Sequence, residues 1–187
     1  MDAVTLLTND HDKVRRLFRD FETAEEAEDS ARQETIAEQI LHELEVHTSI
    51  EEEILYPAAG ELSEETRKLM LEGVEEHHVV DTLMSEISDL GPDDEAFAAK
   101  MTVLIENVEH HAEEEESELF PKLREELGDA ALKRLGTELA AAKERHEAGA
   151  ATDGRSRDEL YSLAQERDLP GRSSMTKEEL AEALEDQ

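Results

Sequence analysis

The sequence has no cysteine and no tryptophan, and aromatic residues make up only 3% of its 187 positions. The missing cysteines exclude disulfides, thiolate metal sites and a cysteine nucleophile, so a transition-metal site would need the eight histidines together with carboxylates. No apolar run approaches the roughly 18 residues of a membrane helix. The N-terminus has neither a basic region nor a cleavable hydrophobic stretch. We therefore expect a soluble, cytoplasmic protein without membrane contact.

Basic residues are scarce as well, with 19 against 51 acidic residues and a net formal charge of -32. This charge makes binding of nucleic acid or an anionic membrane by the bulk of the surface repulsive, and it fits a salt-adapted cytosol where ions screen self-repulsion. The low hydrophobic fraction, 37%, raises disorder as an alternative. Amphipathic periodicity over most of the chain argues against disorder.

Glycine and proline fall at a few interruptions between long helical patterns. The interruptions lie near 28–31, 57–63, 91–92, 128 and 148–154. The amphipathic segments between them cover about 2–28, 31–56, 63–90 and 94–127, followed by a shorter one at 129–147. Four helices with short connections predict an all-α, up-down-up-down four-helix bundle, to which the last segment adds a fifth helix.

Each of the four predicted long helices has a histidine in its apolar stripe, and two also have a glutamate there. The first, for example, reads Val4, Leu7, His11, Val14 with the 3–4 spacing of a buried helix face. The candidate site residues are His11, His47, Glu51, His77, His111 and Glu115.

An internal repeat selects the same residues, because His47-x3-Glu51-x5-Pro57 recurs 64 residues later as His111-x3-Glu115-x5-Pro121. The midpoints of the pairs 11/47 and 77/111 fall in predicted turns. The six groups are therefore expected in one layer of the bundle.

A glutamate four residues after a histidine is weak evidence alone, because 37 of the 187 residues are glutamate. An unpaired carboxylate in an apolar stripe, however, costs several kcal/mol, so Glu51 and Glu115 need a partner. Ion pairs with histidine are one solution, and metal ions that bind all six groups are the other. Imidazole with carboxylate suits iron, manganese or zinc. Six ligands exceed one tetrahedral zinc site and favour two ions.

These residues resemble the hemerythrin-like family with its His-His-Glu (HHE) cation-binding domain. The resemblance covers about residues 1–147 and is carried by the motifs Asn9-Asp10-His11-Asp12, His47 to Pro57 and His111 to Pro121. It implies two iron ions in a non-heme centre held by the six candidate residues. It also implies binding or processing of dioxygen, peroxide or nitric oxide, with oxidative-stress defence as one setting. Whether the protein turns over a substrate is left open, and manganese and zinc stay as alternative metals.

One departure concerns a fifth histidine of the oxygen-carrying members, whose two possible positions here are Gly73 and Asp81. An iron with an extra open position favours redox chemistry over simple oxygen carriage. The remaining histidines, including His78 and His110, are expected at the surface or next to ligands. Glu52 and Glu116 are expected on solvated faces.

Residues 155–187, after a predicted linker at 148–154, read as helix, bend, helix. This unit resembles the N-terminal module of transcription termination factor Rho and SAP-like domains, which implies nucleic-acid contact. Its basic residues are Arg155, Arg157, Arg167, Arg172 and Lys177. From Asp153 onward, however, ten acids outnumber these five bases, which favours protein docking or a structural hairpin. Two alternatives therefore remain: an iron-storage or iron-sensing protein without turnover, and a DNA-associated stress protein acting through this module.

Overall fold

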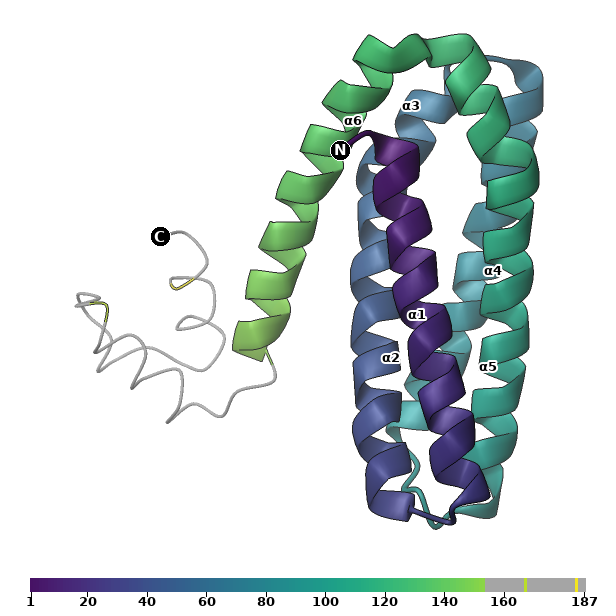
Figure 1. Cartoon of the computed structure of the whole chain (residues 1–187), viewed down its shortest axis with the longest axis vertical. Helices are drawn as coiled ribbons and strands as arrows, with labels where there is room; N and C mark the ends of the chain where they lie inside the picture. Colours follow the sequence, from purple (N-terminus) through teal and green to yellow (C-terminus); the bar gives the residue numbers. More distant parts are fainter. Residues whose placement is uncertain (154–166, 168–183, 185–187) are drawn as a thin grey trace. The chain divides into compact units, whose positions relative to one another are not determined.

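The protein is described by a computed structural model that covers residues 1–153 and, beyond them, only Arg167 and Leu184, with side chains described to residue 147. Four long helices form the bundle (Figure 1). They are α1 (Ala3–Glu26), α2 (Ser30–Ile50), α4 (Glu64–Ser88) and α5 (Glu95–Glu114). Helix α1 packs against α2 and α5, and α4 packs against the same two helices. The predicted all-α four-helix bundle is confirmed.

Short polar side chains begin each bundle helix by accepting hydrogen bonds from first-turn N–H groups. The caps are Asp2, Asp29, Ser63 and Asp94, with acceptor distances of 2.8–3.2 Å. Such caps satisfy donors that have no partner inside the helix. They fix the start of each helix and thereby the height at which its histidine enters the bundle.

One cluster of the core consists of aliphatic side chains with three phenylalanine rings, those of Phe18, Phe21 and Phe97. Phe21 of α1 and Phe97 of α5 lie with ring centroids 6.1 Å apart, and both are almost fully buried. Ile40, Leu44, Met101 and Leu104 fill the space around them. This packing supplies the apolar burial that holds the four helices together.

Two helices of the bundle, α2 and α5, continue through a single wide turn, and the first of them runs past its expected end. After α2 the chain forms the π-helix η1 (Glu51–Leu55) and then α3 (Tyr56–Gly60). After α5 it forms η2 (Glu115–Leu119) and then α6 (Phe120–Asp153). The prediction that the second helix stops at 56 is therefore wrong. A proline follows each wide turn at its second position, and its ring would clash with the carbonyl four residues earlier in a regular α-helix. The wider turn avoids this clash.

Helix α6 contains the predicted interruption at Gly128, whose φ of 73° and ψ of 166° are not helical. Beyond it the chain is helical to Asp153, so the described part of the predicted linker at 148–154 is helical. Alanine-rich sequence favours helix, which outweighs the glycines there. The chain divides into compact units at 1–140 and 141–187. The predicted module at 155–187 lies outside the described residues apart from Arg167 and Leu184, and its boundaries stay a prediction. None of the described helices is long and apolar enough to cross a membrane.

Candidate metal centre

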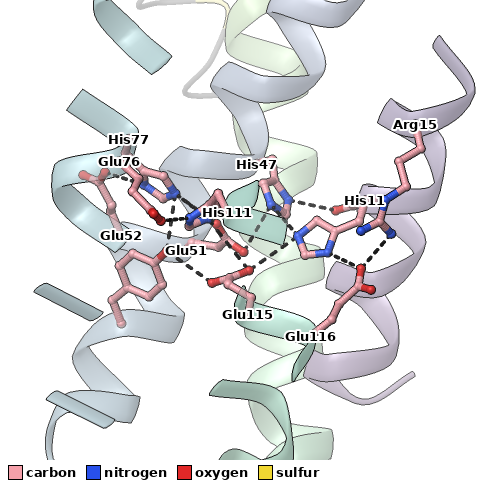
Figure 2. Close-up of polar contacts among 12 residues, drawn as sticks. His11, Arg15, His47, Glu51, Glu52, Glu76, His77, His111, Glu115 and Glu116 are labelled. Atoms are coloured by element: carbon pink, nitrogen blue, oxygen red, sulfur yellow. Dashed lines mark hydrogen bonds and ion pairs between the residues drawn. The ribbon is translucent and has the colours of Figure 1, made fainter. Parts of the chain in front are cut away.

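All six residues predicted from the sequence lie together inside the bundle (Figure 2). Each of the four main helices contributes one histidine. The two glutamates are the first residues of the π-turns η1 and η2. Every one of the six is buried, and Glu51 is completely inaccessible to solvent. The wide turns therefore begin at the two buried carboxylates, and π-turns of this kind are frequent at functional sites.

The four histidines form two pairs with their Nε2 atoms facing each other. His11 and His47 have these atoms 3.2 Å apart, and His77 and His111 have them 3.1 Å apart. Figure 2 shows the two glutamates between the pairs.

Both glutamates reach both pairs. Glu51 lies 3.2 Å from His47 Nε2 through Oε1 and 3.5 Å from His77 Nε2 through Oε2. Glu115 Oε2 lies 3.4 Å from His11 Nε2 and 4.0 Å from His111 Nε2. Each carboxylate is therefore placed to bridge two cations.

The buried carboxylates lack the hydrogen bonds that such groups need. Both oxygens of Glu51 and Oε2 of Glu115 have no hydrogen-bond partner among the described residues. Burial and the neighbouring Glu115 carboxylate raise the pKa of Glu51 well above its usual range. Buried polar groups without partners are costly, and a cation is the partner that this set of ligands can take. The His and Glu cluster therefore fits metal binding.

Burial affects the other groups of the cluster differently. It acts to raise the pKa of Glu115 as well, but the contact with His11 at 3.4 Å and the nearby histidine charges outweigh it and lower this pKa. Burial also lowers the pKa of His47 to about 4. His47 is therefore neutral at physiological pH, which is the form that binds a metal ion.

An outer ring of carboxylates orients the imidazoles through their Nδ1 atoms. Glu116 lies 2.8 Å from His11, Glu52 lies 2.8 Å from His77, and Glu76 lies 2.7 Å from His111. These carboxylates accept the Nδ1–H, which leaves the Nε2 lone pair pointing at the centre, an arrangement typical of metal sites. His47 has only the more distant Asp10 at 3.9 Å.

One prediction about this outer ring was incomplete. Glu52 and Glu116 do not lie on purely solvated faces, because each orients a histidine across the bundle. His78 and His110 were expected at the surface or next to ligands, and their side chains, 66% and 65% exposed, lie at the surface. Sequence periodicity separates buried from exposed faces, but it does not show which half-exposed carboxylate reaches back to an imidazole.

The sequence repeat is visible in the outer ring too. The contact of Glu52 with His77 corresponds to that of Glu116 with His11. Asp10 and Glu76 likewise occupy equivalent places, each directly before a histidine. The centre therefore has two similar halves related by the duplicated hairpin.

The halves differ at one aromatic residue. Phe120 stacks on His11 with ring centroids 5.8 Å apart, whereas its counterpart Tyr56 stacks on His77 at 5.4 Å. The Tyr56 hydroxyl donates to Glu115 Oε1 at 3.2 Å and lies 3.3 Å from His77 Nε2. Burial raises the pKa of Tyr56, so the phenol stays protonated.

Gly73 makes room for this hydroxyl, since a Cβ there would lie 2.7 Å from the Tyr56 oxygen. The equivalent position in the other half is Leu7. Tyr56 was missed from the sequence, although the departure from the repeat at Tyr56 and Gly73 was a signal. The oxygen thus occupies the side of the centre where the sequence lacks a fifth histidine.

An apolar cavity reaches the centre from the core side. Its lining includes all four histidines together with Val14, Val80 and Val108. Such an apolar surface gives small neutral molecules access to the four imidazoles of the site and disfavours the entry of ions.

The sequence model described as Hemerythrin HHE cation binding domain matches residues 2–123. A crystal structure of a Hemerythrin HHE cation binding domain-containing protein from Mycobacterium kansasii superposes with a TM-score of 0.67 and 23% identity, covering 98% of this chain and 99% of that one. At this identity the likeness concerns the fold alone. A DNA nickase from Nostoc sp. is 28% identical over 145 residues, which are 76% of this chain. The chain spans 39% of the length of that relative.

Proposed function

Since this chain belongs to the hemerythrin HHE cation-binding domain family, we propose that it holds two iron ions and binds or processes dioxygen, peroxide or nitric oxide. The observation that carries the proposal is the set of three buried carboxylate oxygens without hydrogen-bond partners, faced by four imidazole nitrogens. Two clusters of these groups share Glu51, which supports two ions rather than one.

The distances divide the six residues between the two proposed ions. His11 and His47 would hold one ion, and His77 and His111 the other, with Glu51 and Glu115 shared between them. Two imidazoles with carboxylates and open positions are typical of non-heme ferrous sites that react with oxygen. The absence of cysteine also argues against a structural zinc site with thiolate ligands.

Bound iron would supply one-electron redox chemistry and an open position for a small ligand. The chain itself positions this chemistry. The outer carboxylates fix the imidazoles, and the apolar cavity excludes water on one side of the centre. The Tyr56 hydroxyl donates to Glu115 Oε1 at 3.2 Å and lies 3.3 Å from His77 Nε2. It could therefore supply a proton to a ligand bound at the ion held by His77 and His111.

Turnover is tested with iron-loaded protein by following hydrogen peroxide consumption and oxygen release at steady state. The double variant His47→Ala/His111→Ala removes one imidazole from each half, and Glu38→Gln, exposed on α2, is the matched control. We expect consumption by the wild type and the control and none by the double variant. Stable binding of dioxygen or nitric oxide without peroxide turnover would instead identify a ligand-binding protein.

The two alternatives from the sequence remain distinguishable from this proposal. A storage or sensing protein would bind iron yet show neither peroxide consumption nor ligand binding. The likeness to a DNA nickase raises DNA association, but the net charge of -32 opposes it. Retention of labelled DNA by the full chain in moderate salt, compared with a chain ending at residue 153, tests that role.

A further inference from the structure

A third group of metal-ligating side chains lies outside the buried centre. It consists of His110 and Glu114 on α5 and Glu76 on α4, and one ligand atom of each lies within 4.8 Å of the others. His110 Nε2 is 3.4 Å from Glu114 Oε1 and 3.9 Å from Glu76 Oε1. The side chains of these residues are 65%, 41% and 29% exposed, in that order, so ions in solvent can reach them. One imidazole with two carboxylates suits a divalent first-row cation.

The duplicated hairpin does not produce this cluster. The positions equivalent to His110 and Glu114 in the other half are Val46 and Ile50, and both are buried apolar residues. The buried ligands, by contrast, occur in both halves. The outer cluster is therefore a feature of the His77/His111 side alone.

Glu76 connects the outer cluster to the buried centre. Its Oε2 accepts from His111 Nδ1 at 2.7 Å, while its Oε1 faces His110. Figure 2 shows Glu76 beside His111, on the outer side of the imidazole. One carboxylate therefore belongs to both groups of ligands.

A cavity is lined by residues of both the outer cluster and the buried centre. Its lining includes the half-exposed Glu76 and Glu114 and also the buried His111 and Glu115. Glu115, whose Oε2 has no hydrogen-bond partner among the described residues, is therefore one of the residues that line this cavity. Gly73 lines it too and leaves it open, because it has no side chain.

We propose that Glu76, His110 and Glu114 form an outer cation site that takes up a divalent first-row ion, such as Fe²⁺, and delivers it to the His77/His111 half of the centre. The strongly negative field of the protein concentrates cations at the surface, and the outer site selects among them by its imidazole. The role as a delivery site rests on the proposed function of the buried centre.

The test compares uptake of Co²⁺ by the metal-free wild type with that of His110→Ala/Glu114→Gln. The matched control is Glu75→Gln/His78→Ala, which removes an exposed His–Glu pair that forms no such three-residue group with other described residues. Ions bound tightly and weakly are counted by equilibrium dialysis at about 0.15 M salt, where surface attraction is screened. Stopped-flow absorbance follows the filling of the buried centre at limiting Co²⁺.

We expect the double variant to keep the tight ions, to lose one weakly bound ion and to fill the centre about tenfold more slowly, as loss of a focusing site predicts. The control should match the wild type in all three measurements. Equal weak binding and equal filling rates in the double variant and the wild type would overturn the outer site and reduce the cluster to surface ion pairs. Absence of tight ions in the wild type would instead refute the proposed function. Circular dichroism checks that both variants fold.

Discussion

Replacing Glu51 by glutamine should stabilise the metal-free protein and remove most of the stabilisation by metal. In the wild type this carboxylate is fully buried, and neither oxygen has a hydrogen-bond partner among the described residues. Its neighbours include the Nε2 atoms of His47 and His77 at 3.2 and 3.5 Å, which are acceptors when Nδ1 carries the proton. A glutamine amide can donate to them without the cost of ionisation.

The size of the effect follows from the missing hydrogen bonds. A buried polar group without a partner costs about 1–3 kcal/mol. Because 1 kcal/mol moves the melting temperature of a chain of this size by about 2–4 °C, metal-free Glu51→Gln should melt about 2–12 °C above the metal-free wild type. Ligand at about 100 times its Kd stabilises the wild type by about 2.7 kcal/mol per site, and the variant should lose most of this gain.

The pH dependence of stability provides a second comparison between Glu51→Gln and the wild type. The raised pKa of Glu51 means that the folded protein binds more protons than the unfolded chain above the ordinary value of 4.5. The contribution of Glu51 to the stability of the metal-free wild type therefore falls as the pH rises above 4.5, until the pH exceeds the pKa of Glu51 in the folded protein. Glu51→Gln should lack this decline.

Melting curves with chelator and with Fe²⁺ under anaerobic conditions, between pH 5 and 8, measure both effects. Glu38→Gln, with the same change at an exposed position, should behave as the wild type. A Glu51→Gln protein that is less stable than the wild type without metal, yet gains as much from metal, would refute the reasoning.

Three further predictions concern other parts of the protein. Gly73→Ala should destabilise the protein by about 1–3 kcal/mol in urea unfolding, because the added Cβ would lie 2.7 Å from the Tyr56 oxygen. In a Tyr56→Phe background the same substitution should cost much less. Equal costs in both backgrounds would contradict the close contact. Metal affinity should rise from pH 5.5 to 7.5 in calorimetric titrations, because metal binding displaces protons from Glu51 and His111. Burial acts to lower the pKa of His111, but the hydrogen bond with Glu76 raises it, whereas His47, with a pKa of about 4, is already neutral. A metal affinity that does not change with pH would contradict this prediction. The melting temperature should increase in molar KCl, because screening relieves the repulsion of the net charge of -32, and a salt-independent value would count against this.

Apolar periodicity was sufficient to predict the helices and the burial of the six histidine and glutamate residues from the sequence. Histidine and glutamate are conspicuous in an apolar stripe, and the repeat distinguishes His77 from His78 and His111 from His110. The π-turns were not predictable in this way, because a single wide turn leaves no change in composition. Pro57 was instead interpreted as a helix end, whereas the helix continues to Gly60.

The surroundings of the ligands were harder to predict for a different reason. Glu52 and Glu116 have the composition of a solvated face, and only the packing of neighbouring helices shows that they reach His77 and His11. Tyr56 was taken as part of the motif that ends in proline. Its role depends on the space beside Gly73, which is a contact between separate helices.

The central claim is that cations bridged by two buried glutamates join the two histidine pairs. Anomalous diffraction at the iron absorption edge, from crystals of protein grown with iron, tests it most directly. We expect two peaks, one beside His11 and His47 and one beside His77 and His111, with Glu51 and Glu115 bound to both ions. A centre without an anomalous peak, with the imidazoles paired directly to the glutamates, would contradict it.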